Sequence, residues 1–357
     1  FFALVINVLD GCTFGLIIFP PHFSVTYNTL GVSVFLYATV IVQVIFTMRS
    51  EFSIGLGTAM AENIPFLHSM AEGIKAVMEK DGKVDEEGFQ SFVDWQITEG
   101  SHGVVPVGTT GESPTLNHDE HKRVVELCID VAKGRVPVIA GAGSNSTEEA
   151  VDFTKHAKEA GADGVLHVCP YYNKPTQEGL YLHFKAVAEC ADIPVIIYNI
   201  PGRSVVDMSV ETMTKLSKLK NIAGVKDATC DLARPLNSRL ACEDGFVQLS
   251  GEDATIGAFL GQGGDGCISV SSNVAPKLCS EMHEAWQSRD MDGFAERRDR
   301  LAPLHDALSC ETSPAPVKYA AHLLGKTAPG CRLPIAPLSV QGQETVRGAM
   351  VKVGLIN

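Results

Sequence analysis

Short apolar runs and amphipathic segments alternate along the chain from residue 81 onward. Seven of the runs are rich in β-branched residues and end in Gly, Pro, Ser or Asn, and we expect strands at 104–108, 137–143, 164–172, 194–201, 222–228, 246–251 and 266–271. The runs are apolar almost throughout, as is typical of parallel strands buried on both faces. Strands that alternate with helices through right-handed crossovers form a parallel barrel or a doubly wound sheet, so the predicted fold class is α/β.

Segments with helical periodicity lie between and after these runs. We expect helices at 86–100, at a segment opened by Thr115, and after the capping residues Asn145 and Ser146. Four more helices should follow the last strand, at 276–289, 292–310, 314–324 and 341–353. These exceed what a bare barrel needs, so they predict a small helical cap at the C-terminus.

A (β/α)8 TIM barrel has eight strands, one more than the seven runs supply. The missing strand should precede the helix at 86–100, where the short run 73–78 is the candidate. We therefore predict a TIM barrel over 71–290 with an atypical first strand, a C-terminal helical region over 291–357, and an apolar N-terminal extension over 1–70.

The N-terminal extension differs sharply in composition from the remainder. Residues 1–48 contain one charged side chain, Asp10, and neither Lys nor Arg. The uncharged segment 31–48 has about the length that a membrane-spanning helix needs, roughly 17–25 residues. Arg49 follows it, which would place the C-terminal side in the cytoplasm. A membrane anchor, a cleaved targeting segment that lacks a basic start, and sequence that is not native remain three open interpretations.

Charge and cysteine content exclude some classes of protein. The chain has 357 residues and a formal net charge of −13, whereas a nucleic-acid-binding protein needs a basic face for phosphates. Its 10 cysteines are scattered and form no Cys-x-x-Cys pair. This spacing predicts neither a zinc site nor a small disulfide framework, and it favours a reducing compartment such as the cytoplasm.

The carboxyl ends of the strands carry the candidate chemistry, because active sites of parallel barrels lie there. Lys226 lies inside the apolar run 222–228, where a buried lysine is costly unless it is paired. One interpretation is an ion pair with Asp227. The other is a desolvated lysine, whose lowered pKa lets it attack a carbonyl group and form a Schiff base.

Other strand ends supply the groups that Schiff-base chemistry needs. Tyr198 can carry a proton. The hydroxyl and backbone N–H groups of Thr109 and Thr110, which have glycines on either side, can hold a carboxylate. Arg203 can hold a second carboxylate through two parallel hydrogen bonds.

Three motifs together resemble those of the dihydrodipicolinate synthase family, which are pyruvate-dependent enzymes of the class I aldolase type. The motifs are Gly108-Thr-Thr-Gly-Glu, Tyr198-Asn-Ile-Pro-Gly-Arg and Gly224-Val-Lys-Asp-Ala-Thr. The resemblance covers the chain from Asp81 to Asn357. One departure is that Ala76-Val-Met-Glu-Lys stands where the family has a strand of the type Ala-Leu-Val-Thr-Pro-Phe.

The resemblance implies a lyase that condenses pyruvate with L-aspartate-4-semialdehyde to give 4-hydroxy-tetrahydrodipicolinate, the first committed step of diaminopimelate and lysine biosynthesis. It implies no metal and no organic cofactor, because the lysine itself is the electron sink. It also implies a homo-oligomer, usually a dimer of dimers. Another pyruvate-dependent aldolase, of the N-acetylneuraminate lyase or keto-deoxy-sugar type, and an inactive barrel with a defective first strand are the alternatives.

The resemblance also implies catalytic roles for individual residues. Lys226 would form the imine with pyruvate, and Tyr198 would relay protons during imine formation and cyclisation. Thr109 would connect Tyr198 to Tyr172, which the neighbouring subunit supplies in this family. Thr110 would bind the pyruvate carboxylate.

The remaining implied contacts are with the second substrate and with an inhibitor. Arg203 would bind the carboxylate of the semialdehyde, while Gly251 and Ile268 would line the pocket. Lysine-inhibited members bind L-lysine at positions that match His118, Asn145, Glu149 and Tyr171, with His121 close by. We therefore expect feedback inhibition by L-lysine.

Overall fold

Residues 82–357 are the part of the chain that this computed structural model describes. Within it, residues Val84–Asn357 form one compact unit. The predicted extension over 1–70, the apolar segment 31–48 and the candidate first strand at 73–78 lie outside the described residues. The boundary predicted at residue 290 stays a prediction.

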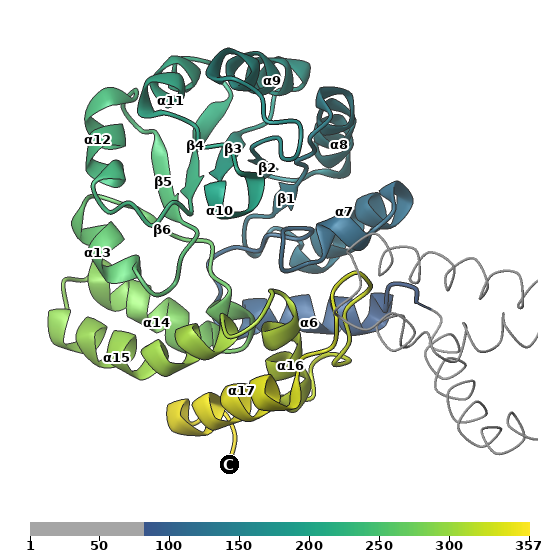
Figure 1. Cartoon of the computed structure of the whole chain (residues 1–357), viewed down its shortest axis with the longest axis vertical. Helices are drawn as coiled ribbons and strands as arrows, with labels where there is room; N and C mark the ends of the chain where they lie inside the picture. The colour runs from purple at the N-terminus through teal and green to yellow at the C-terminus, as the bar shows by residue number, and fades with distance from the viewer. Residues whose placement is uncertain (1–81) are drawn as a thin grey trace, which may run out of the picture. The chain divides into compact units, whose positions relative to one another are not determined.

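A curled sheet of parallel strands forms the centre of this unit, with helices around its outer face (Figure 1). The strand order across the sheet follows the order along the chain, as right-handed βα repeats require. The strands are β1 (Ile139–Gly141), β2 (Gly164–Val168), β3 (Val195–Asn199), β4 (Ile222–Asp227), β5 (Val247–Ser250) and β6 (Gly266–Cys267).

The first predicted run, 104–108, is only partly a strand. Val104 forms an isolated parallel bridge with Val138 beside β1, and the Gly141 N–H donates to the Pro106 carbonyl at 2.9 Å. The chain then leaves the sheet, because Val107 has a positive φ of 57°. A side chain at position 141 would meet the Val107 carbonyl oxygen at 2.2 Å, so only glycine permits this close approach.

The last strand is shorter than the predicted 266–271. The carboxylate of Asp253 accepts hydrogen bonds from the N–H groups of Val270 and Ser271, at 2.9 and 3.0 Å. These two backbone donors are therefore taken by a side chain and cannot extend the sheet.

The helices largely confirm the sequence-based expectations. The one predicted to open at Thr115 begins instead at His118, because Asn117 and Glu120 form a capping box there. The helices of the sheet region are α6 (Glu86–Thr98), α7 (His118–Ala132), α8 (Thr147–Ala160), α9 (Gln177–Cys190), α10 (Pro201–Ser204), α11 (Val210–Ser217), α12 (Arg234–Ala241), α13 (Ile256–Gly261) and α14 (Pro276–Gln287). The C-terminal helices are α15 (Met291–Leu308), α16 (Ala315–Leu323) and α17 (Val340–Val353).

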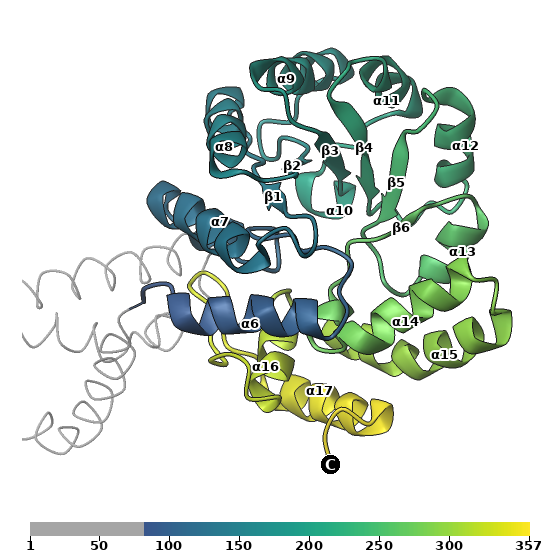
Figure 2. The ribbon, with the colours of Figure 1, turned by 180° about the vertical axis from the view of Figure 1, so that it is seen from behind.

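Two large cores hold these elements together. One packs α7, α8, α9 and α11 against the outer face of β1–β4. The other joins α13 and α14 to α15, α16 and α17, which lie together beyond one end of the sheet (Figure 2). A smaller cluster lines the inside of the curl and is centred on Leu166, Ile196 and Tyr198. Among residues 82–357, no helix combines the length and the apolar character needed to cross a membrane.

Candidate active site

Lys226 and Tyr198 lie side by side on β4 and β3. They are directly opposite each other in the strand register, and the Nζ atom of Lys226 lies 4.1 Å from the centre of the Tyr198 ring. Both residues are buried, with 9% and 6% of their surfaces exposed. The structure therefore brings the predicted nucleophile and the predicted proton carrier together on neighbouring strands.

The inner wall around this pair is apolar and closely fitted. Ile268 packs against the cluster that contains Tyr198. A side chain at position 251 would lie 2.8 Å from the Cβ of Ala228 and 3.1 Å from the Cε of Lys226. Gly251 therefore leaves the space that the lysine occupies, and both predicted lining residues lie beside the reactive pair.

Asp227 is not the ion-pair partner of Lys226, so that interpretation of the lysine is wrong. Successive residues of a strand point to opposite faces, and Asp227 points outward, toward the helices. Its carboxylate lies 3.3 Å from Nε of Arg234 and accepts hydrogen bonds from the N–H and hydroxyl of Thr229, at 2.8 and 2.6 Å. Among residues 82–357, no carboxylate forms an ion pair with Lys226.

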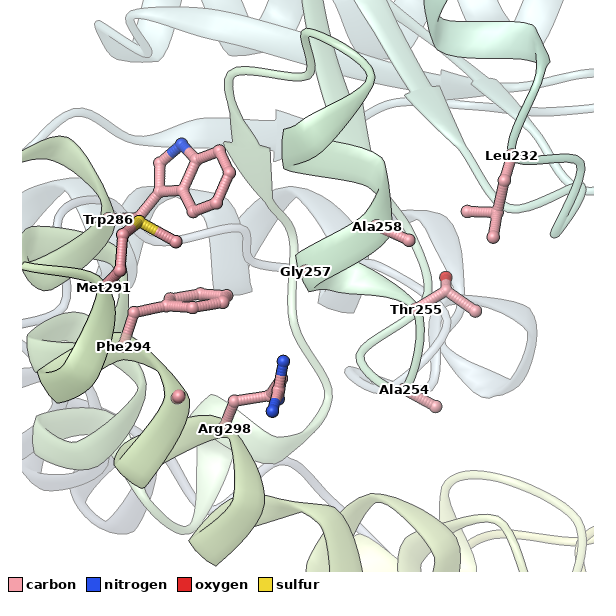
Figure 3. Close-up of a pocket in the computed structure, with 10 residues that line it drawn as sticks. Leu232, Ala254, Thr255, Gly257, Ala258, Trp286, Met291, Phe294 and Arg298 are labelled. Carbon is pink, nitrogen blue, oxygen red and sulfur yellow. The ribbon is translucent and has the colours of Figure 1, made fainter. Parts of the chain in front are cut away.

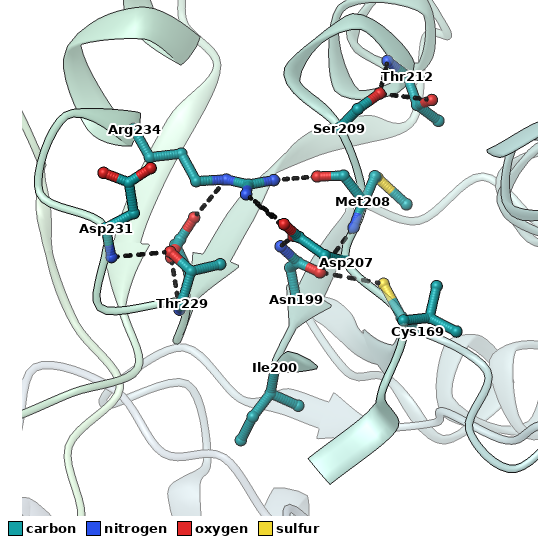
Figure 4. A network of polar contacts seen from close by, with 12 residues as sticks. Cys169, Asn199, Ile200, Asp207, Met208, Ser209, Thr212, Thr229, Asp231 and Arg234 are labelled. Carbon is teal, nitrogen blue, oxygen red and sulfur yellow. Dashed lines mark hydrogen bonds and ion pairs between the residues drawn. The ribbon is translucent and has the colours of Figure 1, made fainter. Parts of the chain in front are cut away.

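Sequence reasoning missed the polar network to which Asp227 belongs (Figure 4). Nη1 of Arg234 lies 2.9 Å from the carboxylate of Asp207, which also accepts a 2.8 Å hydrogen bond from the side-chain amide of Asn199. Burial raises the pKa of the Asp227 carboxyl, and the hydrogen bonds from Thr229 and the charge of Arg234 oppose that rise. The sequence contains one pattern that could have indicated this network. Two polar residues, Asn199 and Asp227, each directly follow a candidate reactive residue in an apolar strand.

Thr109 and Thr110 lie half-buried in a turn after Val107. The turn is held by Glu112, whose side chain is 6% exposed. The carboxylate of Glu112 pairs with Lys318 of α16 and accepts a 2.8 Å hydrogen bond from the Arg332 N–H. Residues more than 200 positions away in the sequence thus fix this turn, which sequence reasoning did not foresee.

Tyr172 and Arg203 are exposed in the single chain. Tyr172 has 90% of its surface accessible and a φ of 70°, which is unfavourable for an aromatic residue. Arg203 lies in the short helix α10 that follows β3. Within the described part of the chain, no hydrogen bond joins Thr109, Tyr198 and Tyr172, so the predicted relay is not formed in one subunit.

The residues of the predicted inhibitor site gather between α7, α8 and the end of β2. Nε2 of His118 lies 3.7 Å from the Glu149 carboxylate, and the side-chain amide of Asn145 donates to the Tyr171 carbonyl at 3.2 Å. Burial, and to a smaller degree the Glu149 charge, raise the pKa of the Tyr171 phenol. Basic, acidic and amide groups therefore share one partly open region.

His121 lies beneath this region instead of facing it. Its ring stacks on Phe153 with centroids 4.0 Å apart, and Nε2 lies 2.7 Å from the carbonyl oxygen of Gly141. Burial lowers its pKa, so the ring is neutral at physiological pH. His121 supports the backbone at the end of β1. No cluster of His, Cys, Asp or Glu suited to a metal ion occurs within residues 82–357.

A separate apolar hollow of about 520 Å³ lies between α13 and α15. Trp286, Met291 and Phe294 line one wall, and Leu232, Thr255 and Ala258 line the opposite one (Figure 3). It contains none of the predicted site residues. Lys226 and Tyr198 lie elsewhere, inside the curl of the sheet.

Residues 67–352 match the model of the dihydrodipicolinate synthetase family. The match begins before Asp81, where the resemblance of the motifs begins. A 4-hydroxy-tetrahydrodipicolinate synthase of Rhodospirillum centenum is 62% identical over 277 residues, which are 78% of this chain and 95% of that protein.

Solved structures agree with this match. A chloride-inhibited dihydrodipicolinate synthase of Acinetobacter baumannii in complex with pyruvate is 45% identical, with a TM-score of 0.75 over 77% of this chain and 95% of the other. A dihydrodipicolinate synthase of Cyanidioschyzon merolae with lysine bound is 36% identical, with a TM-score of 0.75 over 77% and 94% of the two chains.

Proposed function

This chain belongs to the dihydrodipicolinate synthetase family, and we propose that it carries out its reaction through an imine on Lys226. It is a lyase that forms 4-hydroxy-tetrahydrodipicolinate, for the diaminopimelate and lysine pathway. The substrates are pyruvate and L-aspartate-4-semialdehyde. The identity of 62% to a synthase favours this activity over that of an N-acetylneuraminate lyase or a keto-deoxy-sugar aldolase.

The observation that carries the proposal is the isolation of Lys226 beside a phenol in an apolar interior. The Lys226 amine attacks the pyruvate C2 carbonyl, and water leaves as the imine forms. Loss of a C3 proton gives an enamine, whose C3 then bonds to the aldehyde carbon of the semialdehyde. Attack of the semialdehyde amine on C2 closes the ring and releases Lys226. The nitrogen of the lysine accepts the electrons, so we propose no metal and no organic cofactor.

The remaining site residues have roles that fit their positions. Tyr198, in contact with the lysine, relays protons to and from the reacting atoms. Thr109 connects Tyr198 to Tyr172 of the neighbouring subunit, and Thr110 holds the pyruvate carboxylate. Arg203, exposed in α10 after β3, binds the carboxylate of the semialdehyde. Gly251 and Ile268 exclude water around the imine.

The wider architecture completes the proposal. Six parallel strands and the Val104 bridge support a (β/α)8 barrel. Tyr172 is exposed and strained, which supports a role across a subunit interface. We propose a homo-oligomer, as a dimer of dimers. The free cysteines of the described residues support a reducing compartment, the cytoplasm.

Borohydride reduction in the presence of pyruvate tests the imine directly. We expect a pyruvate-derived mass increase on the peptide that contains Lys226, together with turnover of both substrates. Lys220, an exposed lysine paired with Asp192, is the matched control, since Lys220→Ala should still be trapped. If full-length folded protein gave no adduct on Lys226, the imine mechanism would be wrong and the inactive barrel would be favoured.

We further propose that L-lysine inhibits the enzyme at the cluster of His118, Asn145, Glu149 and Tyr171. The Glu149 carboxylate can pair with an amine of the ligand, while Asn145 and Tyr171 can bind its carboxylate. Millimolar L-lysine should slow the wild-type enzyme, and Glu149→Gln should abolish that response. Glu148→Gln, an exposed neighbour, is the control that should stay sensitive. An unchanged wild-type rate in millimolar L-lysine would rule out the site.

A further inference from the structure

Each reactive residue is followed directly by a polar residue on the opposite face of its strand. Tyr198 precedes Asn199, and Lys226 precedes Asp227. The β3–β4 register sets Tyr198 opposite Lys226 and Asn199 opposite Asp227. Because strand residues alternate between faces, the inner pair performs the chemistry while the outer pair lies under the helices. Any shift of the outer pair moves the backbone that carries the inner pair.

One guanidinium connects both outer residues. Arg234, at the start of α12, contacts Asp227 at 3.3 Å and Asp207 at 2.9 Å. Asp207 accepts the 2.8 Å hydrogen bond from the side-chain amide of Asn199, and the side-chain Oδ1 of Asn199 accepts one from the Met208 N–H at 3.1 Å. Arg234 also donates to the Met208 carbonyl. Figure 4 shows the guanidinium of Arg234 directed at Asp207 and at Met208.

The network is buried on the β4 side and reaches the surface at Asp207. Asn199 is fully buried, and Arg234 and Asp227 are 8% and 9% exposed, whereas the Asp207 side chain is 50% exposed. Surface ion pairs contribute little to stability, whereas removal of one partner from a buried pair leaves an uncompensated charge. The planar guanidinium of an arginine has several N–H donors and can hold two acceptors at a fixed separation. The ammonium group of a lysine cannot do this equally well.

We propose that Arg234 is a positioning residue for the reaction: through Asp227 on β4 and through Asp207 and Asn199 on β3, it fixes Lys226 relative to Tyr198. The proposal rests on the imine mechanism above. Misplacement of reacting groups by 1 Å can cost about 100-fold in rate, so a clamp outside the pocket can control the chemistry inside it. Arg234 itself touches no substrate.

The test compares Arg234→Gln and Arg234→Lys with Arg239→Gln, which changes an exposed arginine of the same helix. Arg234→Gln should lower kcat and the single-turnover rate of borohydride trapping by about 10- to 100-fold while KM for pyruvate changes little. Arg234→Lys should recover part of the rate, and Arg239→Gln should match the wild type. Rates are expressed per folded enzyme, from active-site titration and thermal unfolding.

Two outcomes separate this proposal from the one on which it rests. No Lys226 adduct in the wild-type enzyme would overturn the imine mechanism. A wild-type adduct, combined with normal kcat per folded enzyme in Arg234→Gln, would overturn the positioning role alone. If Arg234→Gln does not fold, the test uses Arg234→Lys and Asp207→Asn, because both retain part of the network. Normal trapping rates in both variants would reject the positioning role of Arg234.

Discussion

The two halves of the proposed active site are fixed in place by different means. In the strand half, Lys226 and Tyr198 are held by the backbone hydrogen bonds of the β3–β4 pair and by the Arg234 network behind it. In the loop half, residues 108–112, Thr109 and Thr110 lie in a turn that no strand supports. Glu112 holds this turn by pairing with Lys318 of the C-terminal region.

The difference indicates that the strand half and the loop half have different tasks. Imine formation needs an amine and a proton carrier at a fixed separation, which two hydrogen-bonded strands supply. Binding of a carboxylate needs backbone N–H groups that converge on one point, and a turn provides these more readily than a strand. We therefore expect damage to the strand half to lower kcat and damage to the loop half to raise KM for pyruvate.

The largest effect should come from Lys226 itself. Lys226→Ala removes the nucleophile, so activity should fall by about 1,000-fold or more and borohydride trapping should disappear. Because the substitution removes a buried amine without an ion-pair partner, thermal unfolding should change little. Retention of trapping in this variant would assign the imine to a different lysine and would break the distinction between the two halves.

The next effect should come from Tyr172, which belongs to neither half of its own chain. Tyr172→Phe should lower activity by about 100-fold, because a proton carrier is lost. When this variant is mixed with Lys226→Ala, unfolded and refolded together, each mixed dimer has one intact site. Activity should then return to about a quarter of the wild-type value. Absence of complementation would show that Tyr172 serves its own subunit.

A smaller effect should follow from a distant change in the loop half. Lys318→Met removes the partner of the buried Glu112 carboxylate, so KM for pyruvate should rise by about 10-fold with kcat nearly unchanged. Unfolding should become easier by about 2–3 kcal/mol. Lys352→Met, at an exposed lysine of α17, is the control. A fall in kcat without a change in KM would place the loop among the elements that control the imine chemistry.

How far the sequence predicted this site depends on the range of the interactions involved. Runs of apolar residues located the strands, and the position of Lys226 within such a run indicated its chemistry. The bonds from Arg234 to Asp207 and from Glu112 to Lys318 join separate elements, and no local pattern marks them. The early exit of the chain at Val107 and the capture of the Val270 N–H by Asp253 were missed for the same reason.

The smallest effect on the reaction should come from a lower pH. It should lower the free energy of unfolding through two buried histidines that pack around the sheet. His167 of β2 and His183 of α9 are buried, and burial lowers their pKa to about 3 and about 4. Each has one ring nitrogen near a threonine hydroxyl, and within residues 82–357 the other has no hydrogen-bond partner. These rings are therefore neutral in the folded protein, whereas in the unfolded chain they titrate near pH 6.5.

Below pH 6.5 the unfolded state binds more protons than the folded state, so stability falls as the pH drops toward these lowered pKa values. At pH 5 the loss should be about 2 kcal/mol for each histidine, measured by urea unfolding at pH 7 and pH 5. His183→Gln should remove the share of that one histidine, because burial also lowers the pKa of His121, His283 and His305, while His322→Gln, at an exposed position, should leave the dependence unchanged. KM for pyruvate of the folded fraction should stay constant, because the loop half contains neither histidine. An increase in KM parallel to the loss of stability would mean that the two halves are coupled.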